Sequence, residues 1–225
     1  MIEATYIDHM GSDLSVVNAA RVSFGKQSEW DWAEVDGEGN LDVLEQRLSD
    51  HDTKLIRYLA KHKHMSPFGH CFATFHVKAP VFVARQLVKH KFLRWNEISR
   101  RYVDDEPEFY VPDQWRGRSA DKKQGSEGIW QPDHHQLDRA IGQVKDLYDQ
   151  MIYDGAAPEL ARMVLPQSMM TEWYWSGSLD AFSDMCLLRC ASDTQAETQE
   201  VANQISHKMH ELFPVSWMAL AKGRG

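Results

Sequence analysis

A dense cationic segment is the part of this sequence that most directly suggests chemistry. Residues 85–102 contain six Lys or Arg side chains and one acid, Glu97, so the segment carries a local charge of +5 in a chain of net charge −8. Such side chains give charge-assisted hydrogen bonds to phosphate oxygens, which suits a small phosphorylated ligand. A solvated helix face would have the same charge, but Asn96 and Ser99 add short hydrogen-bonding groups and favour a binding site. The six cations are Arg85, Lys89, Lys91, Arg94, Arg100 and Arg101.

The histidines and cysteines do not suggest a metal site. No pair of the 11 histidines is joined by a carboxylate or cysteine in a ligand spacing such as HExxH, so we expect no bound metal. Cys71, Cys186 and Cys190 match neither a disulfide framework nor a CxxC zinc site, which favours a reducing cytoplasm. None of them lies in the cationic segment, where a thiolate would be stabilised, so we expect no catalytic cysteine.

The cationic segment follows a stretch with the period of a β-strand. Residues 71–78 alternate in hydrophobicity, which predicts a strand that ends at Pro80. Because proline suits the first turn of a helix, we expect residues 81–91 to be helical. Gln86 and His90 would then share one face of that helix. In the strand, Cys71, Ala73, Phe75 and Val77 alternate with Phe72, Thr74, His76 and Lys78.

The second half of the chain has mainly helical periodicity. Apolar residues between positions 137 and 151 keep a helical spacing, with Gly155 as a natural terminator and Pro158 as the start of the next helix. Ser178 is placed to cap another helix, and a capping-box pattern at Ser192 predicts a further helix start. A strand-containing first half followed by a helical second half predicts an α+β fold.

Length and composition favour one cytoplasmic domain. The chain has 225 residues, 43% of them hydrophobic, which is enough for one sizeable core and does not exclude two small domains. It begins without a basic segment leading into a long apolar run, and no stretch reaches the roughly 18 apolar residues that cross a bilayer, so we expect no membrane partner. The net charge of −8 argues against a nucleic-acid polymer as partner.

Two polar stretches, residues 25–40 and 115–128, interrupt the otherwise regular periodicity. We expect both to be surface loops. The second is basic and contains glycines, so it could serve as a lid over a site or be an ordinary solvated excursion.

The cationic segment also resembles the motif of a known family. Lys89-His90-Lys91, seven further residues and Ser99 resemble the signature R-H-R-x7-S of flavin-dependent thymidylate synthases, and NEISRRY at 96–102 matches its inner part. The resemblance extends to MGSDLSVVNAARVSF, to HMSPFGHCFATFHVKAPVFVARQ and to ARMVLP and LLRCASDTQAE. Because it covers most of the chain, it implies one domain of that family over residues 1–225, with the two polar stretches as insertions.

The resemblance implies a site for dUMP. Arg189 would be the catalytic residue beside the pyrimidine, where a fixed cation stabilises the ring ionised at N3 and raises electron density at C5. Arg162 and Ser99 would hold the phosphate. A surface cation on a helix is the alternative interpretation of both arginines. The positions that match dUMP-binding residues are Gln86, Leu87, Val88, Lys89, Glu97, Ile98, Ser99, Arg100, Arg101, Arg162 and Arg189.

The resemblance also implies a site for FAD, with His64 close to flavin and folate. Here the sequence departs from the family. Both arginines of the signature are lysine, which lacks the planar fork of arginine, and Asp180 stands where an arginine is usual. A carboxylate there would repel the flavin diphosphate, so we expect weaker FAD binding than in the family. The positions that match flavin-binding residues are Ser66, Lys89, His90, Lys91, Glu97, Ser178, Asp180 and Asp184.

The implied activity is reductive methylation of dUMP to dTMP. NADPH would reduce FAD, methylenetetrahydrofolate would supply the carbon, and flavin hydride would complete the methyl group, so the enzyme needs no nucleophile of its own. The resemblance further implies a homotetramer with sites shared between subunits. The altered flavin positions leave two alternatives open, a pyrimidine-nucleotide hydroxymethylase and a nucleotide-binding protein that has lost its cofactor.

Overall fold

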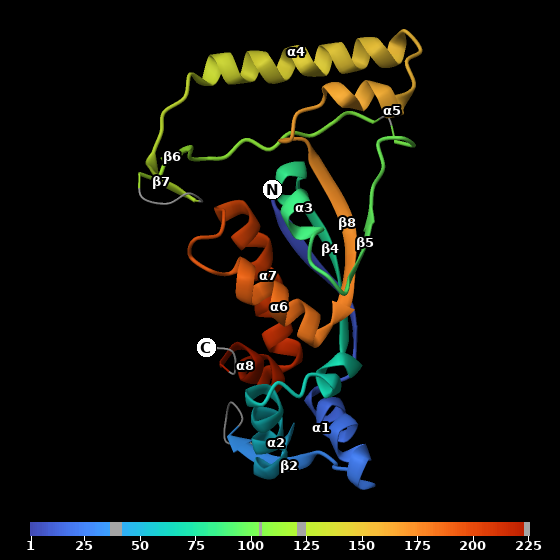
Figure 1. Cartoon of the computed structure of the whole chain (residues 1–225), viewed down its shortest axis with the longest axis vertical. Coiled ribbons are helices and arrows are strands. Elements are labelled where there is room, and N and C mark those ends of the chain that lie inside the picture. Colours follow the sequence, from blue (N-terminus) through green and yellow to red (C-terminus); the bar gives the residue numbers. More distant parts are fainter. Residues whose placement is uncertain (37–41, 104, 121–124, 223–225) are drawn as a thin grey trace.

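A four-stranded antiparallel sheet forms the centre of the molecule (Figure 1). The computed structural model describes residues 1–36, 42–103, 105–120 and 125–222. The strand order is β1-β4-β8-β5, so strands that pair in the sheet are never numbered consecutively along the chain. These strands are β1 (Glu3–Met10), β4 (Phe72–Pro80), β8 (Met170–Ser178) and β5 (Leu93–Glu97).

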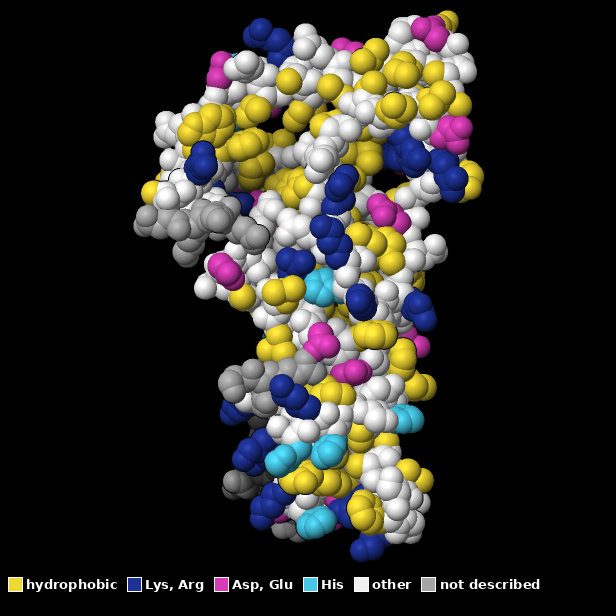
Figure 2. Space-filling view, viewed as in Figure 1, with side chains coloured by type: hydrophobic (Ala, Val, Ile, Leu, Met, Phe, Trp, Pro, Cys, Tyr) yellow, Lys and Arg dark blue, Asp and Glu magenta, His cyan; other side chains and the backbone are white. Residues whose placement is uncertain are grey.

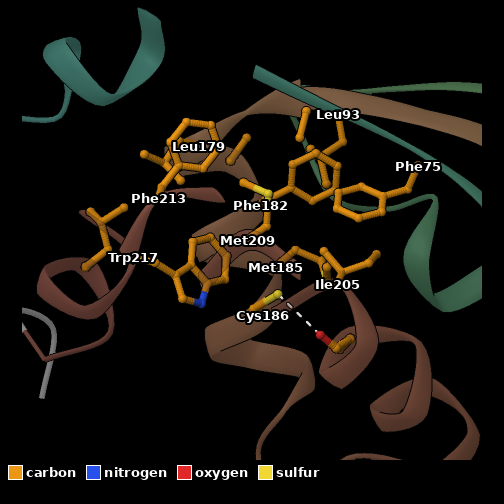
Figure 3. Close-up of a cluster of buried hydrophobic side chains, with 14 of the residues drawn as sticks. Phe75, Leu93, Leu179, Phe182, Met185, Cys186, Ile205, Met209, Phe213 and Trp217 are labelled. Atoms are coloured by element: carbon orange, nitrogen blue, oxygen red, sulfur yellow. Dashed lines mark hydrogen bonds between the residues drawn. The ribbon is translucent and has the colours of Figure 1, made fainter. Parts of the chain in front are cut away.

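The sheet is two-faced because its strands alternate in burial. Ala73, Phe75 and Val77 point inward from β4, and Trp173 and Trp175 do so from β8. Helices α6 (Leu179–Arg189) and α7 (Ala196–Leu212) cover this inner face. Figure 3 shows the resulting core, in which Phe182 of α6 packs edge-on against Phe75 with ring centroids 5.4 Å apart. The α+β fold class predicted from sequence is therefore confirmed.

Strand β8 corrects the prediction of a wholly helical second half. Residues 170–178 pair with β4 on one side and β5 on the other, so β8 is a central strand. Gly177 lets β5 approach β8 closely, because a Cβ at this position would lie only 2.3 Å from Leu93 Cδ2. Thr171, Trp173 and Trp175 are buried in alternation with less buried neighbours, which is the usual burial pattern of a strand.

Helix α3 (Val81–Leu87) is shorter than the predicted helix over 81–91. Pro80 does end the strand and precede the helix, as expected. The helix stops because β5 must begin at Leu93 in register with Gly177, so the chain has to reverse direction in five residues. Phe92 takes a left-handed conformation with φ of 67° in that reversal. Gln86 and His90 consequently do not share a helix face.

The two polar stretches form hairpins where loops were predicted. Strands β2 (Asp31–Asp36) and β3 (Asp42–Arg47) pair with each other, and so do β6 (Arg116–Arg118) and β7 (Ser126–Ile129). Pairing satisfies backbone groups that an irregular loop would leave to water. Parts of both stretches, residues 37–41 and 121–124, lie outside the described residues.

The other helix boundaries follow the sequence, with one exception. Helix α4 (His134–Tyr153) ends just before Gly155, whose φ is 87°, and α5 (Pro158–Ala161) starts at its proline. Ser178 is the N-cap residue of α6. The predicted start at Ser192 is wrong, because α7 begins at Ala196 with Gln195 as its N-cap. The side chain of Gln195 instead accepts a hydrogen bond from Gln86.

Most of the remaining helices lie at one end of the long molecule, whereas α4 lies across the other, together with α5 and the short helix Arg162–Val164 (Figure 1). Asp13 is buried and accepts hydrogen bonds from the backbone N–H groups of Val215 and Ser216 at 2.9 and 2.8 Å, so it joins the two ends of the chain. The helical elements not yet given are α1 (Asp13–Arg21), η1 (Val22–Phe24), α2 (Asp50–Lys61), η2 (Ser66–His70), η3 (Arg162–Val164) and α8 (Pro214–Lys222).

Candidate functional site

Arg189 connects the end of α6 to two residues that lie about a hundred positions earlier in the chain. Its Nε donates to His90 Nε2 at 3.0 Å, and its Nη2 donates to the Gln86 carbonyl at 3.2 Å. The side-chain amide of Gln86 in turn donates to Gln195 Oε1 at 2.6 Å. The turn after α3, the end of α6 and the start of α7 therefore meet at one half-buried polar cluster.

The electrostatics of this cluster keep His90 neutral. Burial, together with the nearby charge of Arg189, lowers the pKa of His90 to about 4. Because Nε2 accepts from Arg189, the ring proton is on Nδ1, which is left as a donor. Burial also lowers the pKa of Arg189. A guanidinium remains charged at neutral pH, so the cluster presents one fixed positive charge and one neutral donor.

A second group of predicted residues lies at the end of β5. Glu97 accepts hydrogen bonds from Thr171 Oγ1 at 2.7 Å and from Trp95 Nε1 at 3.0 Å, which fixes its carboxylate. The chain then turns, with the N–H of Tyr102 donating to the Ser99 carbonyl at 2.9 Å. Arg101 lies over the ring of Tyr102 with its Cζ 5.0 Å from the ring centre.

A cavity of about 500 Å³ adjoins this turn. Glu97, Ile98 and Arg100 line it from one side, and Arg162 of η3 lines it together with the segment that leads into β8. Arg85 of α3 contributes to the same wall. Figure 2 shows Lys and Arg side chains gathered over the region where α3 leads into β5.

A third group lies where η2 meets the start of α6. The N–H of Leu179 donates to the Cys71 carbonyl at 2.8 Å and joins these two elements. Ser66 is exposed at the first position of η2, and the Ser178 hydroxyl donates to Asp180 Oδ1 at 2.5 Å. The Asp180 carboxylate is thus already engaged by its neighbour.

His64 has a defined backbone position just beyond α2. Its N–H donates to the Leu59 carbonyl at 2.9 Å, and that of Lys63 donates to the Ala60 carbonyl at 3.2 Å, the two bonds of a Schellman motif. Lys63 takes the left-handed position with φ of 57°, where glycine is usual. The His64 ring stacks beside Tyr58, with centroids 6.0 Å apart and planes at 27°.

Most of the predicted residues therefore fall into three groups, and His64 lies apart from them just beyond α2. Leu87 is fully buried in the core, so only its backbone could face a ligand. Val88, by contrast, is half exposed. Two contacts were missed, those of Thr171 with Glu97 and of Gln195 with Gln86. The alternation of residues 170–178 could have revealed Thr171, whereas no local signal pointed to the Gln195 contact.

Comparison with known proteins decides the family. Residues 5–215 match the family described as thymidylate synthase complementing protein. The chain belongs to this family. It is 38% identical over 215 residues to a flavin-dependent thymidylate synthase of Thermus thermophilus, covering 95% of this chain and 73% of that one. It is 34% identical over 221 residues to that of Thermosipho africanus, covering 96% and 89% respectively.

A solved structure of similar fold supports the same assignment. The crystal structure of a UMP/dUMP methylase, PolB from Streptomyces cacaoi, bound with 5-Br dUMP, superposes with a TM-score of 0.80 at 32% identity. The match covers 97% of this chain and 94% of that one. A second structure of PolB contains 5-Br UMP and has the same TM-score.

Two of the three thiols of this family member are poorly suited to nucleophilic attack. Burial raises the pKa of Cys71 to about 11 and raises that of Cys186 well above its ordinary value. Cys190 differs, because a hydrogen bond from Cys186 lowers its pKa. The described residues contain no cluster of three or more His, Cys, Asp or Glu that could hold a metal ion. None of the helices in the described part of the chain is both long and apolar enough to cross a bilayer.

Proposed function

We propose that this chain is a flavin-dependent thymidylate synthase that methylates dUMP at C5 to give dTMP. The observation that carries the proposal is Arg189, held by His90 and Gln86 at the half-buried end of α6. The names of the family, of its relatives and of the structurally similar methylase support the same activity. They favour methylation over hydroxymethylation.

Arg189 would act on the pyrimidine. A guanidinium fixed at two donor positions needs no reorganisation to stabilise negative charge as N3 ionises, and this raises electron density at C5. His90 stays neutral and offers Nδ1–H as a donor, so it would orient a ligand by a hydrogen bond without adding charge. Gln86 is held by Gln195 and would orient the base from the same side.

The phosphate would bind at the cavity beside β5. Arg162 and Arg100 line this cavity, and Ser99 and Arg101 lie in the adjoining turn. Charge-assisted bonds to phosphate from such residues are each worth about 1.5 to 3 kcal/mol. The nucleotide would therefore be held by one group of residues and activated by another.

The residues present suit FAD in part. Lys89 and Lys91 are exposed in the turn after α3, and their charges suit a diphosphate. Ser66, His90 and Ser178 would add hydrogen bonds, but Asp180 and Asp184 bring negative charge. FAD, once bound and reduced by NADPH, supplies the hydride, and methylenetetrahydrofolate supplies the carbon. His64 would lie by the flavin and folate. That FAD binds more weakly than in the family stays a prediction.

We further propose a cytoplasmic homotetramer whose sites combine residues of different subunits. Apolar side chains that one subunit leaves exposed support this assembly. Leu147 and Tyr153 of α4 are 49% and 87% exposed, and Phe92 beside the candidate site is 82% exposed. If these side chains are covered by other subunits, the assembly removes their apolar surface from water.

An anaerobic incubation with dUMP, FAD, NADPH and methylenetetrahydrofolate tests the function. We expect a product heavier than dUMP by CH₂, identified by mass, whose formation requires all four components. A product heavier by CH₂O would indicate the hydroxymethylase, and dUMP binding without any product or flavin spectrum would indicate a protein that has lost its cofactor. UMP belongs in a parallel reaction, because the similar methylase is named for both nucleotides.

A further inference from the structure

The cavity beside β5 has an uneven distribution of charge that the proposed function does not by itself explain. The cavity has a volume of about 500 Å³ and is lined by four cations and five carboxylates. The count alone would suggest a site that repels anions. The cations are Lys78, Arg85, Arg100 and Arg162, and the carboxylates are Glu97, Asp105, Glu106, Glu108 and Glu172.

Two of the cations are already paired across the cavity wall. Lys78 Nζ lies 2.5 Å from Glu108 Oε2, and Arg100 Nη1 lies 2.9 Å from Asp105 Oδ1. The Arg100 side chain is also largely buried, at 10% exposure, so it is held against that partner. These pairs neutralise two carboxylates and occupy two cations.

The other three carboxylates are engaged from elsewhere. Glu106 pairs with Lys145 of α4, and Glu172 Oε2 lies 2.8 Å from His76 Nε2. Glu97 accepts from Thr171 and from the indole of Trp95. Each carboxylate of the cavity therefore has a hydrogen-bond donor among the described residues.

Two guanidinium groups of the cavity remain without a carboxylate partner among the described residues. Arg162 donates only to the Glu159 carbonyl in its own turn, at 3.3 Å, and Arg85 forms no hydrogen bond or ion pair with any residue in the described part of the chain. Both line the same cavity. Two forked donors without a carboxylate partner suit a phosphate group, which accepts several charge-assisted bonds at once.

We propose that Arg85 is a second phosphate-binding residue, acting with Arg162 on the 5′-phosphate of the nucleotide. The inference rests on the proposed function and adds a residue to its site. Arg85 lines the cavity, while the next residue, Gln86, is bonded to Gln195 beside Arg189. Two consecutive residues of α3 would thus serve the phosphate and the base from different faces of the helix.

Calorimetric titrations of dUMP, 2′-deoxyuridine and inorganic phosphate test the proposal without catalysis. Arg85→Ala should weaken dUMP and phosphate binding about 10- to 100-fold and leave deoxyuridine binding unchanged. Arg85→Lys keeps the charge and should lose less affinity. Arg57→Ala, which removes an exposed arginine of α2, is the matched control and should bind all three ligands like the parent. Circular dichroism and melting curves verify folding of every variant.

The outcomes separate this inference from the proposed function. Parent-like affinity of Arg85→Ala for dUMP and phosphate would overturn the role of Arg85 while leaving the function intact. Equal weakening of dUMP and deoxyuridine would also overturn it, since a phosphate contact cannot act on the nucleoside. If the parent bound phosphate but not dUMP, and Arg85→Ala lost phosphate, the anion site would stand and the proposed function would fail. A parent that bound neither ligand would overturn both.

Discussion

Arg189 and His90 form an unusual pair, because a permanent cation donates to a ring that can accept only while it is neutral. The bond of 3.0 Å and the burial of the ring both oppose protonation of His90. In the unfolded chain a histidine takes up a proton near pH 6.5. His90 therefore lowers the free energy of unfolding as the pH falls from 6.5 towards about 4, the range in which only the unfolded chain is protonated.

Replacing Arg189 should change both this pKa and turnover. In Arg189→Ala the pKa of His90 should rise towards 6.5, because burial would remain but the neighbouring charge would not. A cation used mainly in the transition state should also lower kcat on the order of 10²-fold, with a smaller effect on KM. NMR titration of the imidazole and steady-state kinetics measure the two effects. Unchanged kcat with weaker dUMP binding would reduce Arg189 to a binding residue.

At the level of single residues, the sequence identified candidates but not their partners. Arg189 was singled out because LLRCASDTQAE resembles the family motif, and it does meet Gln86 and His90. The link from Gln86 to Gln195 joins positions 109 residues apart, which no local spacing could indicate. Arg85 was noticed only as one charge among six, since its lack of a carboxylate partner is a property of the folded cavity.

Element boundaries were predictable where a single local preference decides them. The alternation in 71–78 and Pro80 correctly placed β4 and the start of α3. The end of α3 was not predictable, because it is set by the register of β5 against Gly177 of a strand far along the chain. Strand β8 was missed although residues 170–178 alternate in burial, since the helical periodicity on both sides dominated the interpretation.

The end of α2 gives a prediction at this scale. Lys63 occupies the left-handed position of a Schellman motif, which costs a residue with a Cβ about 1 to 2 kcal/mol. Lys63→Gly should therefore raise the free energy of unfolding by about 1 kcal/mol. Lys54→Gly is the matched control, because the same substitution at an exposed position inside α2 should lower it by about 1 kcal/mol. Urea unfolding measures both, and a loss of stability in Lys63→Gly would contradict the strain.

At the scale of the whole molecule, the core and the residues expected to bind dUMP lie in different places. One core lies between the inner face of the sheet and α6 with α7, and α4 extends across the far end with a single buried side chain, Tyr148 (Figure 1). The residues expected to bind dUMP divide between the Arg189 cluster and the cavity of Arg162. A division of this kind is what a site shared between subunits would produce, and it could not be foreseen from the order of residues along the chain.

Mixing two inactive variants tests whether the sites are shared. If one subunit supplies Arg189 and another supplies Arg162, Arg162→Ala and Arg189→Ala should each be nearly inactive alone. When they are dissociated together and reassembled at equal amounts, roughly a quarter of the sites should regain both arginines. Gln86→Ala mixed with Arg189→Ala is the control, because these residues contact each other within one subunit and no mixed site can contain both. Light scattering establishes the oligomer before the assay. No recovery in the first mixture would place Arg162 and Arg189 in the site of a single subunit.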